Sequence, residues 1–70
     1  MKNKFAERLK DLREEKGLSQ AQLAKAVNNL ITQSAIGHWE LGKRTPNLDA
    51  VILLADFFGV SIDYLAGREN

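Results

Sequence analysis

The 70-residue sequence contains no cysteine, a single proline and no long apolar run. Without cysteine there is no disulfide and no thiolate metal site, so a reducing compartment is the natural setting and we expect a cytoplasmic protein. The opening residues, MKNKFAERLK, reach charges before any apolar run, so we expect neither a signal peptide nor a membrane span. A chain this short buries only about 60% of its unfolded surface, which predicts one domain whose marginal core would gain from association.

Groups that carry catalysis are equally scarce. The single histidine, His38, has no nucleophile partner and no second histidine or carboxylate at metal-ligand spacing. The carboxylates are scattered along predicted helices, and no glycine-rich phosphate loop is present. We therefore expect no enzyme, no metal and no cofactor.

The net charge of +1 hides an uneven distribution along the chain. Residues 1–16 carry a net +2, residues 17–46 a net +2 and residues 47–70 a net −3. Such an imbalance is typical of a molecule that presents one side to a polyanion, although chance asymmetry in a small domain is the alternative.

Apolar residues recur at helical spacing and no segment alternates like a strand, which predicts an all-α fold. A first helix ends at Gly17, and its apolar stripe contains Phe5, Leu9, Leu12 and the stem of Lys16. Ser19 and Gln22 form a capping box that begins a short second helix, whose buried face is Leu23, Ala24 and Val27.

Three more helices are predicted after the link NNLIT. Thr32 caps a helix over residues 33–41, closed by Gly42. Asn47 caps a fourth helix that ends at Gly59, and its core face is predicted to be Leu48, Val51, Ile52, Ala55 and Phe58. Ser61 caps a last short helix, IDYLA, which Gly67 follows.

The second and third predicted helices, followed by the basic loop KRTPN, form a helix-turn-helix arrangement. A helix about 10 to 12 Å across fits the DNA major groove, which is about 12 Å wide. At about 100° per residue, Trp39 and Glu40 lie within about 60° of Ile36 and face the domain. The outward residues, predicted to read bases, are Gln33, Ser34, Gly37 and His38.

The chemistry of this outward set suits DNA. Glutamine can pair with adenine through two hydrogen bonds, serine can contact several base edges, and glycine would let the DNA approach the helix closely. His38 could instead be an ordinary solvated side chain.

Three blocks carry a family resemblance: GLSQAQLA, IGHWELGKRTP and LADFFGVSIDYL. In this order they resemble the DNA-binding domain of phage Cro and lambda-type repressors, the XRE-like helix-turn-helix family, over residues 5–67. The resemblance implies a compact five-helix domain over residues 1–67 and a polar tail over 68–70. The link Asn28–Ile31 is longer than usual in this family, and its asparagines could adopt the left-handed conformation that glycine normally supplies.

The resemblance also implies roles for single residues. Gln33 and Ser34 would read bases, and His38 would make a later base or phosphate contact. Arg13 and Glu40 would form an ion pair between the first and third helices, the alternative being two separate solvated charges. The predicted phosphate-binding residues are Gln20, Thr32, Lys43, Arg44 and Asn47.

A leftover apolar strip on the fourth helix predicts self-association. Ala50, Leu53 and Phe57 lie about 140° to 200° from the expected core stripe, so with Tyr64 or Leu65 they are candidates for a two-fold interface. The alternative is that Phe57 folds under the last helix.

We therefore expect a transcriptional regulator that occupies a palindromic operator in double-stranded DNA as a homodimer. An antitoxin-type or protein-interaction module on the same scaffold is the alternative, and it would need a more apolar outward face on the third helix.

Overall fold

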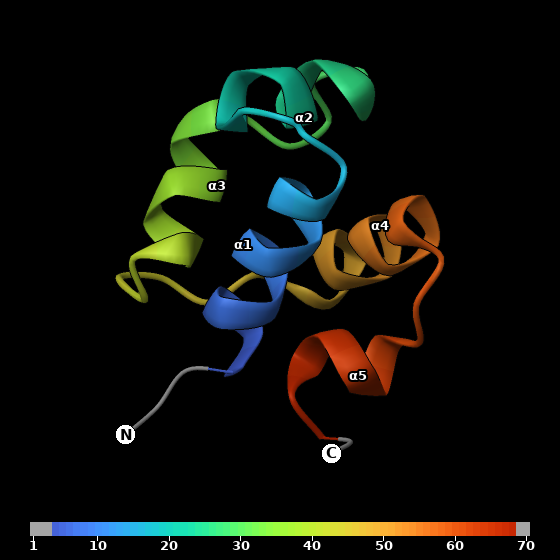
Figure 1. Ribbon diagram of the computed structural model, residues 1–70. Helices are drawn as coiled ribbons and strands as arrows, with labels where there is room; N and C mark the ends of the chain where they lie inside the picture. Colours follow the sequence, from blue (N-terminus) through green and yellow to red (C-terminus); the bar gives the residue numbers. More distant parts are fainter. Residues whose placement is uncertain (1–3, 69–70) are drawn as a thin grey trace.

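Four helices are arranged around a first, central helix in the computed structural model, which describes residues 4–68 (Figure 1). Helix α1 (Lys4–Glu15) is central, α2 (Gln20–Ala26) and α3 (Gln33–Glu40) lie beside its end, and α4 (Leu48–Phe58) and α5 (Ile62–Ala66) complete the other side. These residues contain no strand, so the predicted all-α, lambda-repressor-like fold is confirmed. No helix among them is both long and apolar enough to cross a bilayer.

The helix boundaries follow from local chemistry. The side chains of Ser19, Thr32, Asn47 and Ser61 each accept a hydrogen bond from a backbone N–H in the first turn of the following helix, as predicted. The Ser19 cap is the reciprocal capping box with Gln22. The third helix ends one residue earlier than predicted, with Leu41 as its C-cap.

Each helix contributes one completely buried large side chain to the core. These residues are Leu9, Leu23, Ile36, Leu54 and Leu65. Around them lie further buried residues, among which Phe5 and Trp39 meet edge to face at 6.0 Å between ring centroids. Truncating any one of the five to alanine would cost about 2 to 5 kcal/mol, a large share of the stability of so small a domain.

The predicted orientation of α4 is wrong in part. Val51, Ala55 and Phe58 face the core as expected, but Leu54 is fully buried while Leu48 is 65% exposed and Ile52 is 37% exposed. The helix LDAVILLADFF is apolar on nearly every side, so its own pattern could not select the buried stripe. Packing against α5 selects it.

Candidate nucleic-acid interface

The turn between α2 and α3 is built on two left-handed asparagines. Asn28 and Asn29 have φ values of 56° and 58°, so both adopt the left-handed conformation that glycine normally supplies at such a turn. The backbone N–H of Asn29 donates to Ala24 at 2.8 Å, which closes the end of α2. Ile31 is 5% exposed and anchors the turn in the core, while its neighbour Leu30 is 73% exposed. One side chain therefore attaches this long link to the domain.

A three-residue network fixes α3 against α1 and α2. The guanidinium of Arg13 donates two hydrogen bonds to the Glu40 carboxylate, Nε to Oε2 at 2.7 Å and Nη2 to Oε1 at 2.9 Å. Gln20 at the start of α2 donates from Nε2 to Glu40 Oε1 at 3.1 Å. The predicted ion pair is therefore formed, and its side chains are only 11% (Arg13) and 4% (Glu40) exposed, which contradicts the alternative of two solvated charges.

The electrostatics of this network favour the charged forms of both partners. Burial by itself would raise the pKa of the Glu40 carboxyl, but hydrogen bonds from Arg13 and Gln20, together with the charges of Arg13 and Lys10, hold that pKa below its ordinary value. The hydrogen bond with Glu40 raises the pKa of Arg13 against the opposing effect of burial. Arg13 also donates to the carbonyl of Leu18 at 2.7 Å, so the link between α1 and α2 is held by the same side chain.

The outward side of α3 is polar. Gln33, Ser34 and His38 are exposed, whereas Ile36 and Trp39 are buried, as the angular argument predicted. Leu41, just after the helix, is a large apolar side chain that is 71% exposed, whereas Trp39 in the last turn is buried. Whether the three polar side chains contact bases stays a prediction.

Gly37, which was predicted to face outward, is half-buried and has Gln20 of α2 as a close neighbour. A Cβ at this residue would lie 3.2 Å from Oε1 of Gln20, so its missing side chain makes room for α2. Helical periodicity places Gly37 relative to Ile36 but carries no information about a neighbour on another helix. Gly37 therefore permits close approach of Gln20. Close approach of DNA at Gly37 stays a prediction.

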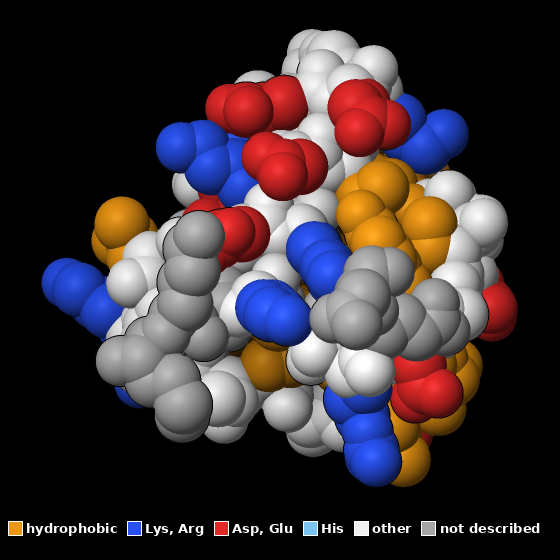
Figure 2. All heavy atoms as spheres, turned by 60° about the horizontal axis from the view of Figure 1, so that its bottom comes forward, with side chains coloured by type: hydrophobic (Ala, Val, Ile, Leu, Met, Phe, Trp, Pro, Cys, Tyr) orange, Lys and Arg blue, Asp and Glu red, His pale blue; other side chains and the backbone are white. Residues whose placement is uncertain are grey.

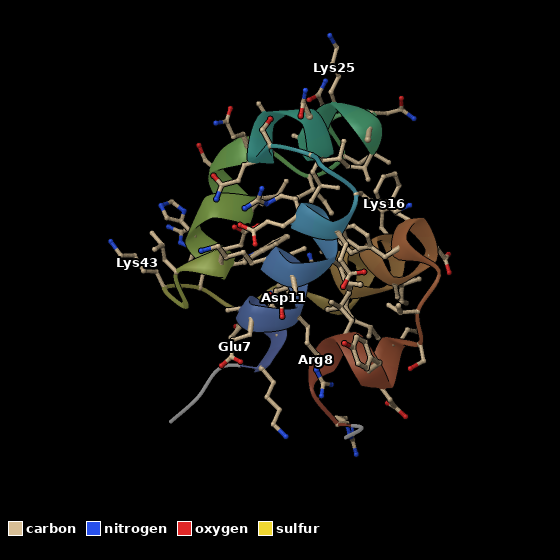
Figure 3. The ribbon with its side chains drawn as sticks, in the orientation of Figure 1. Glu7, Arg8, Asp11, Lys16, Lys25 and Lys43 are labelled. Atoms are coloured by element: carbon tan, nitrogen blue, oxygen red, sulfur yellow. The ribbon has the colours of Figure 1, made fainter. Side chains whose placement is uncertain are left out.

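Several predicted phosphate-binding residues keep a donor while serving the fold. Thr32 and Asn47 use a side-chain oxygen to cap α3 and α4, which leaves the Thr32 hydroxyl hydrogen and the Asn47 amide hydrogens for a ligand. Lys43 and Arg44 are exposed in the loop after α3. Gln20 uses one amide hydrogen on Glu40 and retains the other. Figure 3 shows that Lys43 lies on the α3 side of the molecule, opposite Lys16.

The net charge differs between segments of the sequence, but the face of the molecule that carries α5 does not have a single sign of charge. On that face, acidic and basic side chains alternate around an apolar patch (Figure 2). In the chain from residue 4 to residue 68, no three His, Cys, Asp or Glu residues gather at a distance that would hold a metal ion.

The predicted association strip is largely part of the fold. Leu65 is completely buried and is therefore excluded as an interface residue. Ala50, Leu53 and Phe57 were expected to be exposed but are half-buried against the core, because the buried stripe of α4 is rotated toward them. Phe57 lies beside Phe58 and below the ammonium of Lys16 at the end of α1, and Tyr64 lies below the guanidinium of Arg8.

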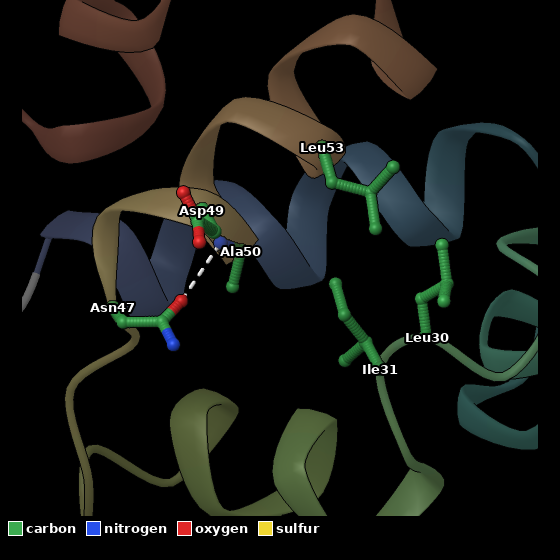
Figure 4. A pocket seen from close by; sticks show the side chains of 6 residues that line it. All are labelled: Leu30, Ile31, Asn47, Asp49, Ala50 and Leu53. Carbon is green, nitrogen blue, oxygen red and sulfur yellow. Dashed lines mark hydrogen bonds between the residues drawn. The ribbon is translucent and has the colours of Figure 1, made fainter.

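Two residues of this strip, Ala50 and Leu53, line a groove between the α2–α3 turn and α4. Figure 4 shows that the side chains of Leu30 and Leu53 converge on it from opposite walls. The other lining residues are Ile31, Asn47, Asp49 and Ala50.

Residues 9–65 match the family model described as Helix-turn-helix. The chain belongs to this helix-turn-helix family. The family expected from the three sequence blocks, XRE-like with a lambda-repressor-like fold, is thus confirmed. No solved structure matches the chain with significance.

The curated relatives carry names of transcriptional regulators. The HTH-type transcriptional activator BcrR of Enterococcus faecalis is 39% identical over 66 residues, which are 94% of this chain and 31% of BcrR. The SPbeta prophage-derived uncharacterized HTH-type transcriptional regulator YonR of Bacillus subtilis (strain 168) is 41% identical over 61 residues, 87% of this chain and 55% of YonR. The HTH-type transcriptional regulator ImmR of the same strain is 32% identical over 66 residues, 94% of this chain and 50% of ImmR. The chain therefore spans about half of these relatives' length or less.

Proposed function

We propose that this chain is a sequence-specific binding domain for double-stranded DNA that regulates transcription by occupying an operator. The observation that carries the proposal is the exposed polar side of α3, Gln33, Ser34 and His38, on a helix whose opposite side is held by the Arg13–Glu40–Gln20 network. A helix so fixed can present the same side chains to base edges each time it enters a major groove.

The surroundings of α3 supply the contacts that position a duplex. Lys43 and Arg44 follow α3 directly, and the caps Thr32 and Asn47 offer hydrogen-bond donors at the starts of α3 and α4. The competing protein-interaction module would need an apolar outward side on α3. No large apolar side chain of α3 is exposed, and the nearest exposed one in sequence, Leu41, is the C-cap of the helix. The catalytic alternative has no support in this site, and we propose no enzymatic activity.

The test begins with selection of bound duplexes from a random pool, followed by titration of the selected site at several salt concentrations. Gln33→Ala should cost about 1 to 3 kcal/mol of affinity for that site and little for a random duplex. Lys43→Ala and Arg44→Ala should each reduce the salt slope by about 1, while the charge-matched control Lys16→Ala, on the opposite side of the molecule, should leave it unchanged. A pool that yields no preferred duplex would contradict the proposal.

We further propose that the domain acts on DNA as a homodimer of the Cro or repressor type, bound to a palindromic site. The exposed side chains Leu48 and Ile52 lie one turn apart on α4, and Ile62 at the start of α5 is 41% exposed, so apolar surface for a partner remains outside the core. Two copies holding their α3 helices about 34 Å apart would reach successive major grooves. With about three or four phosphates per subunit, the salt slope would be on the order of −6.

Sedimentation equilibrium tests the dimer. The double variant Leu48→Glu with Ile52→Glu should give a folded monomer with weaker binding to the selected palindrome, because charged side chains would be desolvated at the interface. Leu30→Glu is the control, since Leu30 is 73% exposed, close to the 65% of Leu48, but lies in the α2–α3 turn. An unchanged dimer mass in the double variant would contradict this interface.

A further inference from the structure

We infer that Gly37 is a positioning residue: by lacking a side chain it lets Gln20 lie against α3 and hold Glu40, and so sets the position of the outward side of α3. The inference rests on the proposed DNA-binding function, and it assigns to Gly37 a role that does not require contact with DNA.

Gln20 lies in close contact with Gly37. Oε1 of Gln20 lies 3.2 Å from where a Cβ would stand, and Cδ and Nε2 of the same amide both lie at 3.9 Å. The amide group of Gln20 therefore lies against the space into which a side chain at residue 37 would project. A methyl group at residue 37 would require Oε1 to move by a few tenths of an ångström.

A movement of the Gln20 amide would disturb its hydrogen bond to Glu40. Nε2 of the same amide donates to Glu40 Oε1 at 3.1 Å, and this oxygen also accepts from Nη2 of Arg13 at 2.9 Å. Because the amide is planar and rigid, displacing Oε1 also displaces Nε2 and weakens the bond to Glu40. Gly37 and Glu40 are thus joined through a residue of the preceding helix.

The positions of Gly37 and Glu40 along α3 connect their contacts with Gln20 to the outward side chains of the helix. Gly37 and Glu40 lie on the side of α3 that contacts Gln20 of α2, and Gly37 lies one turn from Ser34 and next to His38. A shift of α3 relative to α2 would move the polar outward side chains relative to the start of α2, where Gln20 is also predicted to contact phosphate. Base readout depends on side chains held within about 0.5 Å of their productive position.

A double-mutant cycle on the intact chain tests the inference, with Gly37→Ala made alone and in the Gln20→Ala background. In binding to the selected duplex, Gly37→Ala alone should weaken affinity roughly tenfold, because residues that share a hydrogen-bond network couple strongly. In the Gln20→Ala background the same change should alter affinity by less than about twofold. Random-duplex binding should change by less than about twofold when Gly37→Ala is added in either background, whatever Gln20→Ala itself removes. The gain in helix propensity from alanine is common to both backgrounds and cancels in the cycle.

Two outcomes would overturn the inference. A loss of equal size in both backgrounds would mean that the added methyl group meets DNA or the backbone rather than Gln20. Unchanged affinity in the single variant would mean that Gln20 yields without moving α3.

A second cycle, on the urea midpoint of the free protein, separates the inference from the proposed function. The midpoint should rise more on Gly37→Ala in the Gln20→Ala background than with Gln20 present, and equal shifts would refute the contact. If the random pool yields no preferred duplex, the proposed function fails while this stability cycle still reports on Gly37 and Gln20.

Discussion

Replacing Glu40 with alanine should weaken DNA binding even though it removes a negative charge near a polyanion. The change deletes the acceptor of three hydrogen bonds, two from Arg13 and one from Gln20. It leaves the Arg13 guanidinium, whose side chain is 11% exposed, with the Leu18 carbonyl as its remaining partner within the described chain. Electrostatics alone would predict tighter binding, so the sign of the effect discriminates between the two accounts.

The magnitude follows from the burial of the pair. Breaking a fully buried pair costs about 3 to 5 kcal/mol and an exposed pair about 0 to 1 kcal/mol, so this nearly buried, doubly bonded pair should contribute about 2 kcal/mol. For a domain of this size such a loss lowers the melting temperature by roughly 8 to 16 °C.

Thermal unfolding followed by circular dichroism measures the stability change, and fluorescence anisotropy with the selected duplex at fixed salt measures the affinity. Glu15→Ala is the control, because Glu15 is exposed at the end of α1 and the net charge changes equally. The reasoning is refuted if the free energy of unfolding of Glu40→Ala lies within about 0.5 kcal/mol of the parent's. It is also refuted if Glu40→Ala binds the duplex as tightly as the parent.

Two further predictions concern the same interface. Because the pKa of Glu40 is lowered in the folded state, its ionised form stabilises the fold above the unfolded-state pKa near 4.5, and this stabilisation is lost as the pH falls through the folded-state pKa. Urea midpoints measured from about pH 6 downward should therefore fall more steeply for the parent than for Glu40→Gln, and parallel curves would exclude Glu40 as a source of the acid sensitivity. In the turn, Asn29→Ala should lower the free energy of unfolding by about 1 kcal/mol because φ is 58°, while Asn29→Gly should change it by less than about 0.5 kcal/mol. Equal stabilities of the two turn variants in urea would show that the left-handed conformation has no energetic cost for alanine at this residue.

The boundaries of the helices were predictable because they depend on neighbours in the chain. Ser19 with Gln22, and Thr32 as the cap of α3, are satisfied within three residues, so the sequence determines them before any packing occurs. The buried and exposed sides of α3 were predictable for a similar reason. Helical periodicity alone places Ile36 and Trp39 on the buried side and His38 on the exposed side.

Other features depended on packing between helices. The buried stripe of α4 was misplaced because the helix is apolar on nearly every side, and only contact with α5 and the core selects Leu54 over Leu48 and Ile52. Leu65 was assigned to a possible interface for the same reason, since a five-residue helix is too short for periodicity to separate a core side chain from a surface one.

The sequence by itself thus determined an all-helical domain of the helix-turn-helix family, the caps of its helices and the polar outward side of α3. The resemblance implied the Arg13–Glu40 pair, but only the tertiary structure decided that Gly37 makes room for Gln20 and that Gln20 joins this pair through Glu40. The physical reason is distance along the chain: Gln20 and Glu40 are 20 residues apart on different helices, so their contact exists only once those helices have packed.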